Sequence, residues 1–186
     1  IATHDVQRID RLVTEIAEAS RIDAELSRTQ FEPVNLLALA RNLVRARDER
    51  GENDPARVRV VTSGHGPWDV PGDEARLVRV IENLLDNAVS FSPSGGKVMV
   101  SLTRDEDRLT MAVLDRGPGI PPEAREKVFD RFHSLRPAEE DFGTHSGLGL
   151  AIARTIAEAH EGTLEAIDRP DGKAGACLVL SLPAVV

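Results

Sequence analysis

Residues 81–92 read Ile-Glu-Asn-Leu-Leu-Asp-Asn-Ala-Val-Ser-Phe-Ser, and this stretch organises the rest of the chain. From residue 77 to residue 88, apolar residues recur every three or four positions, which predicts a helix with one wide face against a sheet. These apolar residues are Leu77, Val80, Ile81, Leu84, Leu85 and Ala88. A second, polar face carries Arg79, Asn83, Asn87 and Ser90. Because asparagine is a poor helix former, this face either lines a pocket or is simply solvated.

Three short motifs follow the asparagine stretch along the chain. They are Asp-Arg-Gly-Pro-Gly at residues 115–119, Phe-Asp-Arg-Phe at residues 129–132 and Ser-Gly-Leu-Gly-Leu at residues 146–150. In this order, after Asn83 and Asn87, they resemble the boxes of the sensor histidine kinase catalytic domain, a member of the GHKL superfamily. Within that family the sequence is most like the ChvG/ExoS type of alphaproteobacterial two-component sensor kinase. The resemblance implies an α/β two-layer sandwich of the Bergerat type, a mixed sheet covered on one side by helices and preceded by a long helix.

The composition fits one mid-sized domain with an appendage. The 186 residues carry 23 basic and 31 acidic side chains, a formal net charge of −8, without a basic block long enough for a nucleic-acid groove. We therefore expect no nucleic-acid partner. Cys177 is the single cysteine, so neither a disulfide framework nor a thiolate metal site is available, which fits a reduced compartment.

The chain lacks a signal peptide and any run of about 18 apolar residues, so we expect a soluble fragment without membrane contact. Because it begins at Ile1 rather than Met, we expect a piece of a longer protein. The resemblance implies that the parent's membrane segments lie upstream, and that this part lies at the cytoplasmic face of the bacterial inner membrane.

Two helices are expected before the first strand of the catalytic domain. Residues 4–28 contain no proline or glycine and keep a seven-residue apolar repeat, which indicates a helix packed along a partner or on its own domain. The resemblance assigns residues 1–30 to the second helix of the dimerisation hairpin, through which the full-length protein forms a homodimer. It assigns residues 31–186 to the ATP-binding catalytic domain, which a periodic helix over residues 34–47 opens after Pro33.

The remaining elements follow from alternation and turn residues. Strands are predicted at residues 58–61, 68–70, 98–102, 109–114, 163–167 and 177–182, and further helices at 121–129 and 147–161. Asp73 is a candidate N-cap for the asparagine helix. The sequence Arg-Pro-Asp-Gly at residues 169–172 predicts a turn between the last two strands.

The resemblance implies that ATP and Mg²⁺ bind at the polar face of the asparagine helix. Mg²⁺ prefers oxygen ligands, and a neutral amide oxygen suits a site that already holds phosphate charge. Asn87 corresponds to the metal ligand, and Asn83 to the catalytic asparagine beside the phosphates; Ser90 and Phe91 end this box. Family members often carry a basic residue where Ser90 stands, so one phosphate contact is missing here or is replaced by Arg79 or Arg136.

Asp115 is the candidate contact to the base. By resemblance its carboxylate accepts the exocyclic amino group of adenine, while Gly117, Gly119 and Ile120 bring the backbone close to the ring. Guanine offers a carbonyl at that place, so ATP is favoured over GTP. Taken alone, Asp-x-Gly is also common turn chemistry.

The segment before the last helix is the candidate phosphate loop. Ser146, Gly147, Leu148, Gly149 and Leu150 stand at a helix start, where free N–H groups attract phosphate, although glycine there also serves close packing. By resemblance residues 133–144 form the nucleotide lid, anchored by the two phenylalanines of the 129–132 motif. Arg131, His133 and Arg136 are the candidate phosphate contacts, while the basic residue usual after that motif is replaced by Ser134.

The resemblance implies transfer of the ATP γ-phosphoryl group to a histidine on the dimerisation helices, for relay to a cognate response regulator. His4 lacks the acceptor pattern, since Gln7 and Ile9 replace its basic residue and proline, so the acceptor is expected outside this chain. Two alternatives stay open: a non-catalytic nucleotide-binding module, and a hydrolytic or serine-kinase member of the superfamily. Hydrolytic relatives carry a glutamate where Asn83 stands, which argues against hydrolysis.

Overall fold

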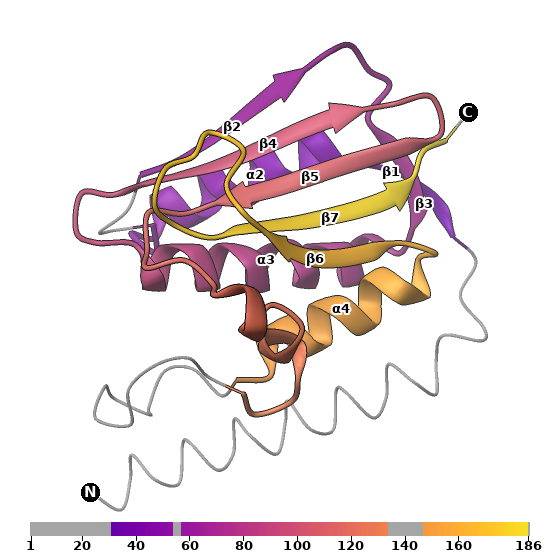
Figure 1. Cartoon of the computed structure of the whole chain (residues 1–186). Helices are drawn as coiled ribbons and strands as arrows, with labels where there is room; N and C mark the ends of the chain where they lie inside the picture. Colours follow the sequence, from indigo (N-terminus) through magenta and orange to yellow (C-terminus); the bar gives the residue numbers. More distant parts are fainter. Residues whose placement is uncertain (1–30, 54–56, 134–146, 186) are drawn as a thin grey trace, which may run out of the picture.

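The computed structural model describes residues 31–53, 57–133 and 147–185 (Figure 1). The strands are β1 (Glu32–Asn35), β2 (Arg57–Ser63), β3 (Asp69–Gly72), β4 (Lys97–Arg104), β5 (Arg108–Leu114), β6 (Thr163–Ile167) and β7 (Cys177–Pro183). The α-helices are α2 (Leu36–Glu49), α3 (Glu74–Phe91) and α4 (Gly149–Ala159). Two 3-10 helices, η1 (Pro122–Ala124) and η2 (Lys127–Phe129), lie between β5 and α4.

The main sheet is five-stranded and mixed, in the order β2-β4-β5-β7-β6. β2 and β4 run parallel, whereas β4–β5, β5–β7 and β7–β6 are antiparallel pairs. β7 therefore pairs with β5 on one side and with β6 on the other (Figure 1). A separate two-stranded sheet joins β1 to β3, with Val34 opposite Val70.

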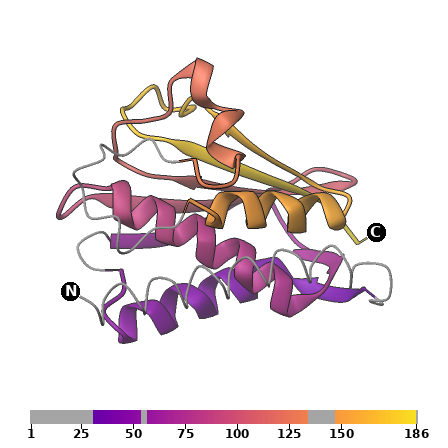
Figure 2. The ribbon, with the colours of Figure 1, turned by 90° about the horizontal axis from the view of Figure 1, so that it is seen from below.

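Alternation along the strands decides which face of the sheet is covered. In β4 the buried residues Val98, Val100 and Leu102 alternate with more exposed ones, and the same period recurs in β5, β6 and β7. Figure 2 shows α2, α3 and α4 on one side of the sheet. The predicted architecture, a mixed sheet covered on one side by helices, is confirmed.

Helix α3 is the centre of the core. Six residues of its apolar face are at most 1% exposed, namely Leu77, Val80, Ile81, Leu84, Leu85 and Ala88. Burial of a leucine or isoleucine side chain contributes about 1.5–3 kcal/mol, so this face holds the helix firmly on the sheet. The Asp73 side chain accepts from the Arg76 N–H at 3.1 Å, which confirms the predicted N-cap.

A buried histidine joins the start of α3 to the end of α4. His160 follows α4, is 1% exposed, and its Nε2 accepts from the Asp73 N–H at 3.1 Å. Its Nδ1 lies 2.7 Å from the Ile156 carbonyl oxygen, so the neutral ring with a proton on Nδ1 satisfies both contacts. The Phe31 ring stacks on the imidazole, with centroids 4.5 Å apart. Gly72 leaves room for the ring, because an added Cβ would lie 2.7 Å from Leu77 Cδ1 and 3.0 Å from His160 Cδ2.

The structure corrects two of the predicted elements. Val34 lies in β1, and α2 begins only at Leu36, because Asn35 is extended and its side chain caps the helix through the Ala38 N–H at 2.9 Å. The helix predicted over residues 121–129 is two 3-10 turns, closed by the Ala124 N–H on the Pro121 carbonyl at 2.9 Å and the Phe129 N–H on the Glu126 carbonyl at 3.2 Å. The helix predicted over residues 4–28 lies outside the described residues.

No described helix combines the length and apolar character that crossing a membrane requires. This finding concerns residues 31–53, 57–133 and 147–185 alone.

Candidate nucleotide site

The end of α3 lies against the Asp115 loop that follows β5. The Ser92 hydroxyl accepts from the Arg116 N–H at 3.3 Å, and a Cβ added to Gly117 would lie 2.7 Å from the Phe91 carbonyl oxygen. Gly117 therefore allows a backbone approach that any side chain would block. Two of the predicted boxes, separated by more than twenty residues, meet here.

Asp115 is buried at the carboxyl end of a central strand. It is 2% exposed, and its Oδ1 accepts from the backbone N–H groups of Gly117 at 2.8 Å and Ala176 at 2.9 Å. The pKa of Asp115 is raised above its ordinary value, because the effect of burial exceeds the opposing effects of these two hydrogen bonds and of the nearby Arg169 charge. The carboxylate is thus rigidly held, in an environment where a hydrogen bond to a ligand donor is strong.

Asn83 lies against the first residue of α4. A Cβ added to Gly149 would lie 3.1 Å from Asn83 Oδ1, so glycine sets the closeness of the two helices. Within the described part of the chain, Asn83 Nδ2 is buried and has no hydrogen-bond partner. A buried amide nitrogen without a partner costs free energy, which a polar ligand would recover.

Helix α4 begins without a side-chain cap, because the residue at its N-cap is Leu148. The first N–H groups of a helix lack intrahelical partners and carry partial positive charge. Together with the adjacent Asn83 amide, this end of α4 has the polarity that a phosphate requires.

The phenylalanine motif is tied to the glycine motif through the backbone. The Phe132 N–H donates to the Gly147 carbonyl at 3.0 Å, and a Cβ added to Gly147 would lie 2.9 Å from the His133 carbonyl oxygen. Phe129 is 6% exposed and lies in the core, whereas Phe132 is 59% exposed with a φ of +65°, so Phe132 is held through its backbone. Apart from His133, the lid that these residues are predicted to anchor lies outside the described residues.

The predicted site residues divide by exposure and by description. Half-buried residues are Asn83, Asn87, Ser90, Phe91, Gly119, Ile120, His133, Gly147, Gly149 and Leu150. Buried residues are Asp115, Gly117 and Leu148. Arg131 is exposed, whereas Arg136 and Ser146 lie outside the described residues. Of these predictions, the contacts above form three groups: Phe91 with Asp115 and Gly117, Asn83 with Gly149, and His133 with Gly147.

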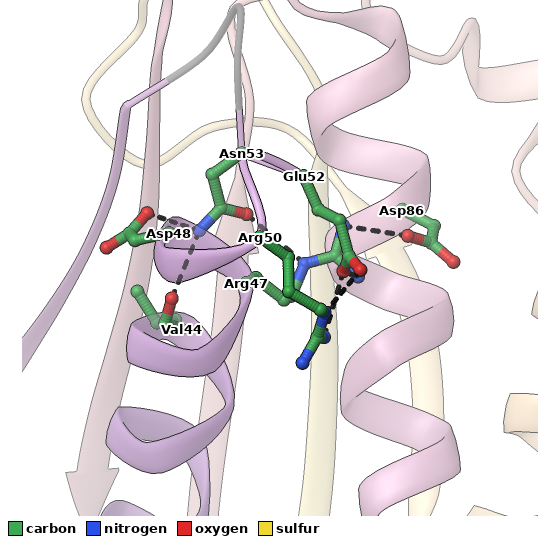
Figure 3. A network of polar contacts seen from close by, with 7 residues as sticks. All are labelled: Val44, Arg47, Asp48, Arg50, Glu52, Asn53 and Asp86. Atoms are coloured by element: carbon green, nitrogen blue, oxygen red, sulfur yellow. Dashed lines mark hydrogen bonds and ion pairs between the residues drawn. The ribbon is translucent and has the colours of Figure 1, made fainter.

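Sequence reasoning missed a buried arginine that tethers α2 to the asparagine helix. Arg47 is 4% exposed; its Nη2 lies 2.8 Å from Asp86 Oδ1 on α3, and its Nε donates to Asn53 Oδ1 at 3.2 Å (Figure 3). Asp86 directly precedes Asn87, so this ion pair helps to fix how α3 is rotated about its own axis relative to α2. The signal was present, because Arg47 continues the apolar stripe of α2 three residues after Val44.

Arg154 of α4 fixes the segment that leads into the phenylalanine motif. Its Nη1 lies 2.9 Å from Glu126 Oε2, and its guanidinium carbon lies 4.9 Å from the Phe129 ring centre. The contact spans more than twenty residues of sequence, so no local pattern indicates it.

Metal binding at this site would depend on few protein ligands. In the described ranges, no three His, Cys, Asp or Glu side chains gather to hold a metal ion. An amide oxygen on α3 together with nucleotide phosphates is a donor set that suits Mg²⁺. The half-buried Asn87 provides such an oxygen on the same helix as Asn83.

Comparison with known proteins identifies the family. Residues 72–186 match the model of the histidine kinase-, DNA gyrase B-, and HSP90-like ATPase family. The chain belongs to this family. It is the histidine-kinase ATPase domain found in two-component sensor kinases, and its fold is theirs.

Individual relatives agree with this assignment. The sensor protein ChvG of Rhizobium meliloti is 45% identical over 99% of this chain, which covers 33% of that protein. ChvG of Agrobacterium fabrum is 41% identical over 99% of the chain and 32% of its own length. The chain thus spans about a third of these relatives.

Solved structures of histidine kinases superpose on the chain. The mycobacterial sensor histidine kinase MprB is 36% identical with a TM-score of 0.67, over 82% of this chain and 97% of its own. Full-length ShkA in complex with AMPPNP has a TM-score of 0.78 at 25% identity, over 95% of this chain and 36% of its own.

Proposed function

We propose that this chain is the catalytic part of a two-component sensor histidine kinase, which binds Mg·ATP and transfers its γ-phosphoryl group to a histidine. The observation that carries the proposal is the Asn83 amide, whose buried Nδ2 lacks a partner among the described residues and whose oxygen side faces Gly149. Family membership and the AMPPNP complex of the structural relative ShkA support nucleotide binding at this place.

Each part of the nucleotide has a matching group in the chain. Asp115 accepts the amino group of adenine, with Gly117, Gly119 and Ile120 beside the ring. The N–H groups at the start of α4 and Asn83 bind the phosphates, joined by His133, Arg131 and Arg136 from the preceding segment. Asn87 would hold Mg²⁺ through its amide oxygen, and the ion would supply neutralisation of the phosphate charge.

The residue at position 83 favours transfer over hydrolysis. An asparagine amide is not a base at neutral pH, so it cannot remove a proton from water as a carboxylate can. Its role is to position the phosphates, and positioning with charge neutralisation accounts for most of phosphoryl-transfer catalysis. The nucleophile is then the histidine of an acceptor domain.

The proposal includes the parts of the signalling system around this domain. We assign residues 1–30 to the second helix of a dimerisation hairpin and residues 31–186 to the catalytic domain. The accepting histidine belongs to the first helix of that hairpin, in a homodimeric parent at the cytoplasmic face of the inner membrane. A cognate response regulator receives the phosphoryl group.

Supplying the acceptor separately tests the proposal. The chain is incubated with γ-labelled ATP and Mg²⁺, alone and with a dimerisation domain that carries a histidine acceptor, and acid-labile phosphate is measured. We expect label on the supplied domain and none on the chain alone, with reduced efficiency because the tether is missing. Stable labelling of His4, or failure to label any acceptor while ATP binds, would overturn the proposal.

A further inference from the structure

The turn between β6 and β7 folds back onto the Asp115 loop. The Asp115 N–H donates to the Ala176 carbonyl at 3.0 Å, and the Ala176 N–H donates back to Asp115 Oδ1 at 2.9 Å. The Arg169 Nη1 group donates to the Asp115 backbone carbonyl. The candidate base-binding loop is therefore built from two segments that lie more than fifty residues apart in the chain.

Arg169 is buried and oriented by a second contact. It is 7% exposed, and its Nε and Nη2 groups bind the two Asp171 carboxylate oxygens at 2.9 Å and 2.7 Å. This bidentate ion pair fixes the plane of the guanidinium group, so its Nη1 atom is directed at the Asp115 carbonyl. The Gly172 N–H closes the turn onto the Arg169 carbonyl at 3.0 Å.

Gly175 makes this close approach possible. Its φ is +126°, and an added Cβ would lie 2.0 Å from the Asp115 carbonyl oxygen. Any side chain at this position would push the turn away from Asp115. The close contact between the β6–β7 turn and the Asp115 loop is thus a contact between two backbone segments.

Among the described residues, the charged and titratable groups around Asp115 come mainly from the β6–β7 turn. Arg169 acts on it while paired with Asp171, Cys177 acts from the start of β7, and the exposed Arg116 follows it in the chain. Burial raises the pKa of the Cys177 thiol to about 11, so it stays neutral, and the bond from Arg169 holds the pKa of Asp171 far below its usual range. Burial nevertheless leaves the pKa of Asp115 above its ordinary value, and the charge of Arg169 lowers it in addition to the hydrogen bonds from the Ala176 and Gly117 N–H groups.

We propose that Arg169 is a positioning residue for adenine recognition: it holds the Asp115 loop in place and, together with the Ala176 and Gly117 N–H groups, favours the charged Asp115 carboxylate that accepts the amino group of the base. This inference rests on the proposed function, because it assumes that Asp115 contacts the base. It adds that the β6–β7 turn, outside every motif of the family resemblance, sets the strength and the pH dependence of that contact.

Adenosine is the probe that isolates the base contact, since it carries neither phosphate nor metal. Its affinity is measured by calorimetry from neutral to mildly acidic pH for the parent, Arg169→Met, Arg169→Lys and Asp171→Asn. We expect Arg169→Met to bind adenosine about five- to tenfold more weakly than the parent at neutral pH. As the pH is lowered, the remaining affinity of this variant should be lost at a higher pH than the affinity of the parent. Arg169→Lys keeps the positive charge but loses the bidentate contact with Asp171. The pH profile of its adenosine affinity should therefore stay close to that of the parent.

Arg125→Met is the matched control, because Arg125 pairs with Asp168, next to Arg169, at 2.5 Å, whereas among the described residues it is Arg169 that contacts Asp115. Its adenosine profile should not move along the pH axis. Equal affinity and an unmoved profile in Arg169→Met would overturn the inference, and so would a weaker affinity with an unmoved profile, which indicates a merely structural role. If Arg169→Met does not fold, parent-like adenosine affinity in both Arg169→Lys and Asp171→Asn overturns it.

Failure of the proposed function gives a different result. In that case the parent itself does not bind adenosine, or Asp115→Asn binds it as well as the parent does. Asparagine keeps the acceptor for the two backbone N–H groups, so this variant tests the base contact without opening the turn.

Discussion

The His160 Nε2 atom accepts a hydrogen bond from the Asp73 N–H at 3.1 Å, and this contact joins the end of α4 to the start of α3. The two helices that carry the glycine and asparagine motifs are thereby fixed to each other at the end away from the candidate nucleotide site. The contact exists only while the imidazole is neutral, because a protonated ring has no acceptor.

The stability of the domain should therefore depend on the protonation of His160. Burial lowers the pKa of His160 below the ordinary value of 6.5, so the unfolded chain binds the proton first as pH falls. The stabilising contribution is complete above about pH 6.5 and is lost as pH falls through the folded-state pKa.

Urea unfolding of the parent and His160→Gln at neutral and mildly acidic pH tests this expectation. The variant should be less stable at neutral pH by about 1–3 kcal/mol, because a buried N–H and carbonyl lose their partner. Its stability should also change less with pH than that of the parent. Parallel pH profiles would contradict a titrating role for His160.

The Arg47–Asp86 pair gives a prediction about the tether between α2 and α3. Arg47→Met should lower the free energy of unfolding by about 1–3 kcal/mol, since the buried Asn53 amide loses its donor. Arg45→Met, on the exposed side of the same helix, is the control and should stay within about 0.5 kcal/mol of the parent. Equal effects in the two variants would show that burial of Arg47 is unimportant.

Asn87→Ala should lose Mg²⁺-dependent ATP binding and keep its fold, because Asn87 lies on the half-buried polar face of α3 and not among its core residues. ATP titrations with and without Mg²⁺, together with melting curves, measure both properties. Binding that responds to Mg²⁺ as in the parent would remove Asn87 from the ligand assignment.

Asp115→Ala should weaken ATP binding about ten- to hundredfold, as expected for loss of a charge-assisted hydrogen bond of roughly 1.5–3 kcal/mol. The metal dependence of binding should not change. Asp105→Ala, in the exposed β4–β5 turn, is a control for loss of an acidic residue. Unchanged ATP affinity in Asp115→Ala would mean that the carboxylate only shapes its loop.

Gly149→Ala separates phosphate binding from stability. Alanine favours helix over glycine by up to about 1 kcal/mol, so the melting temperature should hold or rise. The added Cβ would lie 3.1 Å from Asn83 Oδ1 and displace the amide, so ATP affinity should fall roughly five- to tenfold. Parent-like ATP affinity would indicate that Gly149 serves helix packing alone.

The sequence predicted the features that depend on local pattern. The apolar period of α3, the Asp73 cap and the alternating strands are local, and each is present in the structure. Predicted elements were wrong where local hydrogen bonding overrides the apolar period: Asn35 caps α2 and leaves Val34 in a strand, and residues 122–129 form two 3-10 helices instead of one α-helix.

The site was predictable only as separate motifs. That Asn83 meets Gly149, or that Asp115 is held from Arg169 and Ala176, depends on strand order and helix packing, which no local spacing specifies. Buried arginines were missed for the same reason, because a charged residue acquires its meaning from a partner elsewhere in the chain.

The position of β7 between β5 and β6 has a consequence for synthesis. During translation β5 emerges more than sixty residues before β7 and has only β4 to pair with, while its other edge waits unpaired. The Asp115 carboxylate likewise lacks its Ala176 donor until that strand has left the ribosome. A nascent chain of this domain therefore exposes an aggregation-prone strand edge and completes the Asp115 loop, the proposed base contact, in one late step, when the inserted strand completes the sheet.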